Sequence, residues 1–111
     1  MTDFPSEGRL AGIDFGTVRI GVAISDPSRT FASPYENYTR RNDKLDAAFF
    51  RQLVDDEQIV VFVVGLPVHT SGDESQKSDE AREFANWLNQ VTGRPIQLQD
   101  DRYTTREATY L

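Results

Sequence analysis

Three aspartates lie at or just after the ends of two predicted strands, and their carboxylates are the groups in this chain best suited to bind a metal ion. Asp14 ends the predicted strand 9–14, whereas Asp100 and Asp101 follow the predicted strand 95–99. Ligands gather at the carboxyl ends of strands in a parallel sheet, where the topology reverses. If these two strands lie close together, the three side chains converge, and such a cluster of like charges favours a bound cation.

Carboxylate oxygens are hard ligands that suit Mg²⁺ or Mn²⁺, and these ions keep room for water and for a substrate phosphate. The chemistry of such a site is in-line hydrolysis of a phosphodiester bond with one or two metal ions. A purely structural role stays open, because aspartates at strand ends often cap helices. Asp100 or Asp101 can cap a helix that begins near Thr104.

A β-hairpin is predicted near the start of the chain. The runs 9–14 and 19–25 are rich in small and β-branched residues, and a short turn that contains Gly16 separates them, which is typical of a hairpin. A third strand is predicted within 31–38. It is expected at the edge of the sheet, because Pro34 interrupts it.

Helices and strands alternate along the rest of the chain. The patterns predict a helix over 43–57 capped by Asn42 or Asp43, an apolar strand at 59–64 buried on both faces, a polar loop over 66–78, a second helix over 79–91, a strand at 95–99 and a third helix from Thr104. The resulting order, β-β-β-α-β-α-β-α, predicts an α/β fold. We expect a mixed, mainly parallel five-stranded sheet with flanking helices, in a single domain over 1–111.

The composition excludes several classes of protein. The chain has 111 residues and no cysteine, so disulfide scaffolds, cysteine-ligated zinc, iron–sulfur clusters and thiol nucleophiles are ruled out. A single histidine leaves no multi-histidine metal site, and no apolar run approaches the ~20 residues that cross a bilayer. No signal peptide is visible among the first residues, so we expect a cytoplasmic protein without a membrane partner.

The formal net charge of -6 would by itself argue against a nucleic-acid partner. The whole surplus comes from residues 43–93, which carry ten acidic and four basic residues, whereas the two flanking segments are balanced. Because the candidate aspartates lie in the balanced segments, the charge does not exclude a nucleic-acid substrate.

Three motifs, in order along the chain, resemble those of the YqgF family. The first similarity is to the family's opening motif, in residues 12–26, GIDFGTVRIGVAISD. The second is to the family's second motif, in residues 64–67, VGLP, followed by Gly72. The family's third motif is normally Asp-Glu-Arg followed by a Thr-Thr or Ser-Thr pair. Residues 100–108, DDRYTTREA, resemble it. The YqgF family comprises ribonuclease H-like proteins described as Holliday junction resolvases or pre-16S rRNA processing nucleases.

The resemblance implies a ribonuclease H-like fold and divalent-metal cleavage of phosphodiester bonds, either in an rRNA precursor or in branched DNA. The family's catalytic carboxylates map onto Asp14 and Asp101, where aspartate replaces the family's usual glutamate at position 101. The shorter side chain of Asp101 can still bind Mg²⁺. Asp14, Asp101 and Asp100 are therefore expected to hold Mg²⁺ or Mn²⁺.

Four further residues are candidates for substrate binding. Gly16 lets the backbone approach a phosphate closely, although a tight turn would explain this glycine equally well. Arg19 and Arg102 can each act as a bidentate donor to a phosphate, or can pair instead with the neighbouring aspartates. Thr104 belongs to the third motif and completes this set.

Alternative functions stay open at this point. The YqgF family continues through a basic loop to a final helix with another catalytic aspartate, and no such segment is visible within residues 1–111. We therefore expect either a metal-dependent nuclease without that C-terminal helix or a non-catalytic ribonuclease H-like module that binds nucleic acid or protein. Residues 14–17, Asp-Phe-Gly-Thr, also resemble the phosphate loop of actin and sugar kinases, but that fold needs a much longer chain. The oligomeric state is open, with a homodimer as one arrangement.

Overall fold

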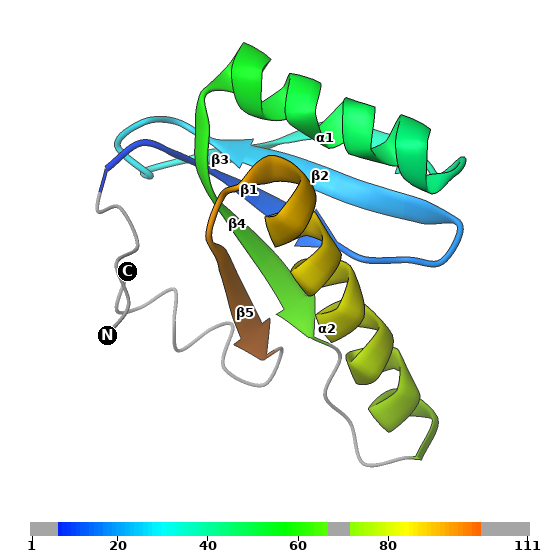
Figure 1. The fold of residues 1–111 in the computed structure, drawn as a ribbon. Coiled ribbons are helices and arrows are strands. Elements are labelled where there is room, and N and C mark those ends of the chain that lie inside the picture. Colours follow the sequence, from blue (N-terminus) through cyan, green and yellow to red (C-terminus); the bar gives the residue numbers. More distant parts are fainter. Residues whose placement is uncertain (1–6, 67–71, 101–111) are drawn as a thin grey trace.

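The computed structural model describes residues 7–66 and 72–100, and within them five strands form one sheet (Figure 1). Along the chain the strands are β1 (Arg9–Asp14), β2 (Arg19–Ser25), β3 (Ala32–Thr39), β4 (Ile59–Leu66) and β5 (Ile96–Asp100). Their order in the sheet is β3-β2-β1-β4-β5. The expected order of elements is confirmed as far as β5, and the helix expected from Thr104 lies outside the described residues.

The sheet is mixed and mainly parallel, as expected, because β1, β3, β4 and β5 run in one direction and β2 runs in the other. Among the described strands, β1–β2 and β2–β3 pair antiparallel, whereas β1–β4 and β4–β5 pair parallel. The physical reason lies in the connections. A short turn suffices between antiparallel neighbours, whereas each parallel step requires a crossover, and here a helix supplies it.

Strand β3 forms one edge of the sheet, which confirms the prediction made from Pro34. Its pairing with β2 is irregular at that residue. Glu36 pairs with Val22 and Pro34 pairs with Ala23, so Tyr35 is left between two regular pairings as a β-bulge.

Two helices connect the strands. Helix α1 (Asp43–Glu57) has the predicted bounds, and Asn42 caps it by accepting a hydrogen bond from the backbone N–H of Leu45 at 2.8 Å. Helix α2 (Gly72–Thr92) begins seven residues before the predicted start at 79, so the prediction of a loop is wrong for 72–78. These residues have no apolar side chains at helical spacing, so the sequence pattern does not indicate a helix there. Their acidic side chains nevertheless favour a helix N-terminus.

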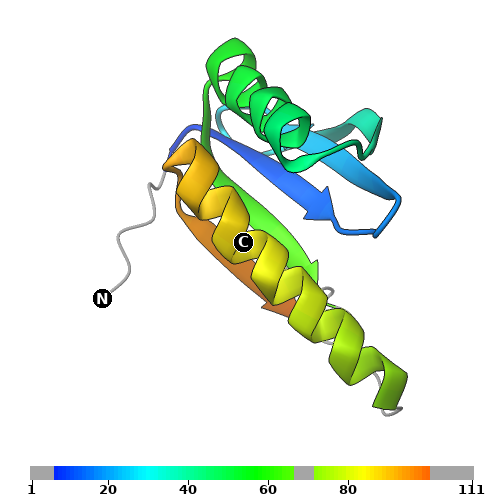
Figure 2. The same cartoon turned by 45° about the vertical axis from the view of Figure 1, so that its right-hand side comes forward.

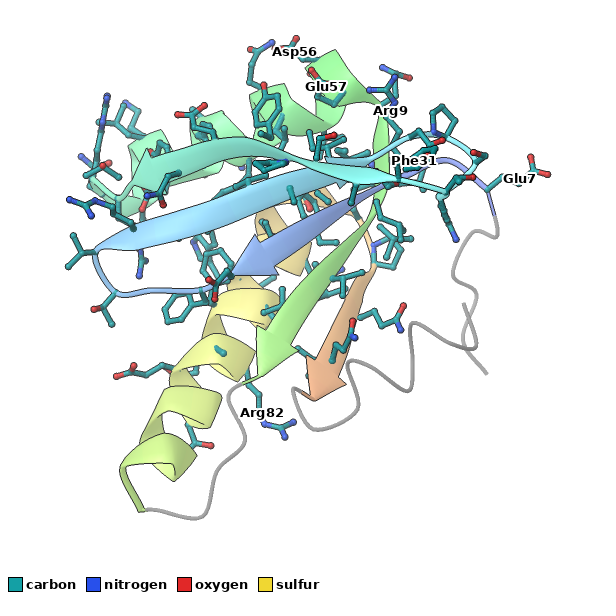
Figure 3. All side chains as sticks on the ribbon, turned by 180° about the vertical axis from the view of Figure 1, so that it is seen from behind. Glu7, Arg9, Phe31, Asp56, Glu57 and Arg82 are labelled. Atoms are coloured by element: carbon teal, nitrogen blue, oxygen red, sulfur yellow. The ribbon has the colours of Figure 1, made fainter. Side chains whose placement is uncertain are left out.

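Both helices cover the same face of the sheet (Figures 1 and 2). Their apolar sides pack on alternate strand residues to form one core, whose fully buried members include Ile20, Phe50, Leu53, Phe62, Val64 and Leu88. Viewed from behind, the strands lie in front of both helices, and no described element covers this second face (Figure 3).

Strand β4 was predicted to be buried on both faces. This holds for Val61, which is buried, but not for Val63, which is partly exposed on the open face, as is Gly65 just beyond the predicted range. At the amino end of β1, Arg9 forms an ion pair with Glu57 at the end of α1, with Nη1 and Oε1 3.0 Å apart (Figure 3). This pair ties the helix layer to the sheet.

Candidate metal-binding edge of the sheet

Asp14 is the last residue of β1, and its side chain is exposed on the open face of the sheet. The preceding Ile13 is 3% exposed and packs in the core, so the alternation of a strand directs Asp14 to the opposite side. Gly21 is its partner across the β1–β2 hairpin. A Cβ placed on Gly21 would lie 3.4 Å from the Cβ of Asp14 and 4.0 Å from its Oδ2, so the absence of a side chain leaves space beside the carboxylate.

A groove of about 820 Å³ runs across this open face, and Asp14 lies in its lining. Its floor is made largely of small residues from the inner strands, namely Gly12, Gly21, Ala23, Val63 and Gly65, while residues 32–37 border it on the side of β3. The groove is therefore mainly apolar, and it brings a ligand that lies along it close to the Asp14 carboxylate.

The register of the parallel strands places the ends of β1 and β5 at the same edge of the sheet. Ile13 pairs with Val64, and Gly65 pairs with Gln99, so Asp14, Gly65 and Gln99 follow one another across three strands. Asp100 comes one residue later and ends β5. Because neighbouring strands lie about 4.8 Å apart, the backbones of β1 and β5 are about 10 Å apart at this edge. Gly65 lies between them and carries no side chain to obstruct the gap.

The described residues thus place the ends of both strands at one edge of the sheet, with β4 between them. The side chain of Asp100 and all of Asp101, Arg102 and Thr104 lie outside the described residues. Within the described part of the chain, no group of three or more histidine or carboxylate side chains could hold a metal ion. Asp14 is therefore the member of the predicted set whose surroundings are known.

The two other candidates within the described residues belong to the hairpin that carries Asp14. A Cβ on Gly16 would overlap the carbonyl oxygen of Arg19, so the tight turn itself requires glycine at this position. Arg19 is exposed at the start of β2. The ion pairs seen among the described residues join Arg9 to Glu57 and Arg40 to Asp46, and neither involves Arg19.

Sequence reasoning overlooked a polar cluster beneath the turn that follows Asp14. Asp46 is 2% exposed on the core-facing side of α1 and accepts a hydrogen bond from the hydroxyl of Tyr38 at 2.7 Å. Burial, first of all, and the hydrogen bond to Asp46 together raise the pKa of Tyr38 to about 12. Arg40 Nε lies 3.6 Å from Asp46 Oδ2. The sequence did contain an indication that Asp46 is buried. It lies four residues before Phe50, at a position that faces the core when a helix packs on a sheet.

No helix in the described part of the chain is both long and apolar enough to cross a membrane.

Solved structures similar to this chain include two of RuvC. One is titled "T. thermophilus RuvC in complex with Holliday junction substrate", with a TM-score of 0.63 and 12% sequence identity over 89% of this chain and 68% of that one. The other, "Thermus thermophilus RuvC structure", has a TM-score of 0.52 and 11% identity over 83% of this chain and 63% of that one. These likenesses concern the fold, and they confirm the expected ribonuclease H-like α/β architecture.

Closer relatives are found by sequence. A protein of Rhodopirellula baltica named "Putative pre-16S rRNA nuclease" is 52% identical over 102 residues, which cover 92% of this chain and 59% of the relative. A protein of Koribacter versatilis with the same name is 41% identical over 101 residues, which cover 91% of this chain and 66% of the relative. The chain thus spans less than two thirds of the length of these curated relatives, 59% of the first and 66% of the second.

The family model described as "RuvX: Holliday junction resolvase" matches residues 8–111, from just before β1 through all three motifs. The resemblance to the YqgF family drawn from those motifs is therefore confirmed, and the chain belongs to this family of RuvX (YqgF) proteins.

Proposed function

We propose that this protein is a nuclease that hydrolyses phosphodiester bonds in structured nucleic acid and depends on a divalent metal ion. The observation that carries the proposal is the exposed carboxylate of Asp14, at the carboxyl end of β1, on the same edge of the sheet as the end of β5. The names of the relatives point to a pre-16S rRNA substrate, and the RuvC structure with a Holliday junction points to branched DNA. An activity on pre-16S rRNA would place the protein in the cytoplasm.

The residues around Asp14 fit a hard divalent cation. The carboxylate is exposed, Gly21 leaves space beside it, and Gly65, on the strand between β1 and β5, contributes no side chain of its own. Asp14 would hold Mg²⁺ or Mn²⁺ together with Asp101 and Asp100, which follow or end β5. When bound, such an ion supplies charge stabilisation to the phosphate that is cleaved.

The hairpin and the segment that follows β5 supply the remaining proposed contacts. Arg19 is exposed, forms no ion pair with the described residues and can donate to a phosphate oxygen, as can Arg102. Gly16 shapes the turn next to Asp14, and its backbone can approach a phosphate closely. Thr104 is proposed as a further donor to the substrate. The groove along the open face would receive the adjoining part of the nucleic acid.

The experiment compares the full-length protein with its Asp14→Asn variant. Two labelled substrates are used, an RNA that carries the 5′ end of a 16S precursor and a four-way DNA junction, each with and without Mg²⁺ or Mn²⁺. We expect Asp14→Asn to lower kcat by at least about 100-fold, because changing residues that merely support metal ligands already costs 10–100-fold. The matched control is Asp55→Asn, which alters an exposed carboxylate on α1 and should leave kcat unchanged.

Cleavage that needs no added metal, or full activity of Asp14→Asn, would contradict the proposal. Binding of either substrate without cleavage by the unmodified protein would instead favour the non-catalytic binding module. Which of the two substrates is cleaved with the higher kcat/KM decides between an rRNA precursor and branched DNA.

A further inference from the structure

We propose that Arg40 is a positioning residue that holds the turn after Asp14, and through it the Asp14 carboxylate, in the geometry needed for metal binding. This inference rests on the nuclease function proposed above. It concerns a residue between β3 and α1 that none of the three motifs contains.

Arg40 contacts both ends of the turn that joins β1 to β2. Its backbone N–H donates a hydrogen bond to the carbonyl oxygen of Val18 at 2.9 Å. Its guanidinium carbon lies 5.4 Å from the centre of the Phe15 ring and 5.9 Å from that of Phe84. The two rings are themselves packed, with centroids 4.9 Å apart. Arg40 therefore contacts the first position of the turn, Phe15, through its side chain and the last, Val18, through its backbone.

The position of Arg40 is in turn fixed by the buried carboxylate of Asp46. One oxygen of that carboxylate, Oδ2, faces Arg40 Nε at 3.6 Å. The other, Oδ1, accepts hydrogen bonds from the Tyr38 hydroxyl at 2.7 Å and from the Arg41 backbone N–H at 3.0 Å. A buried carboxylate is costly without a cation beside it, so the guanidinium has little freedom to leave the two rings.

This arrangement bears on Asp14 because the carboxylate stands at the point where regular strand pairing stops. Asp14 pairs with Gly21, and the next residue is Phe15, which Arg40 covers. If Phe15 loses the guanidinium that packs on its ring, the first position of the turn and the end of β1 beside it are free to tilt. A misplacement of about 1 Å costs an enzyme on the order of 100-fold in rate.

A direct contact between Arg40 and a substrate phosphate is the competing explanation, and the surroundings oppose it. Arg40 shares its pocket with three acidic side chains, Asp43, Glu80 and Glu83, which repel phosphate. The guanidinium packs on Phe84 of the core, on the helix side of the sheet, whereas Asp14 faces the open side.

The test uses the full-length protein and the variants Arg40→Gln and Arg40→Lys. Lysine keeps a positive charge beside Asp46 and so protects folding, but it lacks the planar group that stacks on the rings. The matched control is Arg51→Gln. Arg51 also joins α1 to α2, through a 2.9 Å hydrogen bond from Nε to the carbonyl oxygen of Val91, about 10 Å along α2 from Phe84.

Three quantities are measured: kcat and KM for cleavage, the Mn²⁺ dissociation constant, and hydrogen exchange of the backbone amide at position 40, which Val18 protects. For both Arg40 variants we expect kcat to fall and the Mn²⁺ dissociation constant to rise by about 10- to 100-fold, with KM unchanged within about twofold. Exchange at position 40 should become about 5- to 30-fold faster, as expected for loss of a partly desolvated cation–π contact. Arg51→Gln should leave all three values unchanged.

Two results would overturn the inference. A rise in KM with unchanged kcat would identify Arg40 as a substrate contact, and unchanged exchange and Mn²⁺ affinity in Arg40→Lys would show that the turn does not depend on the guanidinium. If the unmodified protein cleaves neither nucleic acid, the nuclease proposal fails. The exchange and Mn²⁺ measurements then still decide the role of Arg40.

Discussion

Replacing Gly21 by alanine separates the stability of the sheet from the function of its edge. Gly21 lies in β2, directly across from Asp14, and its φ is not in the positive range that favours glycine. Alanine can therefore adopt its backbone conformation. The added methyl would lie 3.4 Å from the Cβ of Asp14 and 4.0 Å from its Oδ2, which are ordinary contact distances that require no shift of the backbone.

The expected consequences for stability and activity have opposite signs. Alanine restricts the unfolded chain more than glycine does, so the free energy of unfolding should rise by about 0.4–1 kcal/mol. For a domain of this size that corresponds to a melting temperature higher by roughly 2–8 °C. The same methyl occupies the space beside the carboxylate, where we place the ion. We expect Mn²⁺ affinity and kcat to fall by about 10-fold or more.

A matched control lies two residues before Asp14 on the same strand and the same face. A Cβ on Gly12 would meet only the carbonyl oxygen of Ala23, at 4.0 Å, and would not approach Asp14. Gly12→Ala should therefore give a similar gain in melting temperature with unchanged Mn²⁺ affinity. Thermal unfolding followed by circular dichroism and calorimetric titration with Mn²⁺ provide the two measurements. The reasoning is refuted if Gly21→Ala binds Mn²⁺ as well as the unmodified protein, or if both variants lose affinity equally.

Two further predictions concern the turn and the buried tyrosine. Gly16→Ala should lower the free energy of unfolding by about 1–3 kcal/mol, because the added Cβ overlaps the Arg19 carbonyl and forces the turn into a strained conformation. Urea denaturation measures this change. An unchanged denaturation midpoint would show that the turn relaxes freely. The pKa of Tyr38 is raised to about 12 by burial and by the hydrogen bond to Asp46, so its stabilising contribution is complete below pH 10, the ordinary value, and is lost as the pH rises through 12. The free energy of unfolding of the unmodified protein should therefore exceed that of Tyr38→Phe below pH 10, and this difference should shrink between pH 10 and 12; a difference independent of pH would contradict the prediction.

Helices and strands were predictable from the sequence where a short segment contains both a capping or turn residue and a regular apolar pattern. Helix α1 was predicted with its observed bounds because Asn42 supplies a cap and the apolar residues behind it recur at helical spacing. The start of α2 was missed because residues 72–78 make their helix without an apolar stripe. Burial of β4 on both faces was inferred from a uniformly apolar run, yet whether a second layer covers Val63 depends on other parts of the fold.

The candidate site divides in the same way. Asp14 could be placed at the carboxyl edge of the sheet because the end of a strand and the motif around it are local features. The space beside Asp14 could not be predicted, because it depends on which residue pairs with Asp14 across the hairpin. Only the observed register identifies that residue as Gly21. The contact of Arg40 with Phe15 and Phe84 joins three distant segments of the chain, and no spacing in the sequence encodes it.

The irregular edge at β3 has a consequence for how this protein behaves at high concentration. An exposed edge strand is a template on which another chain can add a strand and begin to aggregate. The edge is flanked by Phe31, whose side chain is 74% exposed (Figure 3). It also includes Tyr35, which is 42% exposed, so aromatic side chains that favour association lie along it. Pro34 and the bulge at Tyr35 break the regular spacing that an incoming strand would need. We therefore expect this edge to resist the addition of a further strand, even though its aromatic side chains are exposed to solvent.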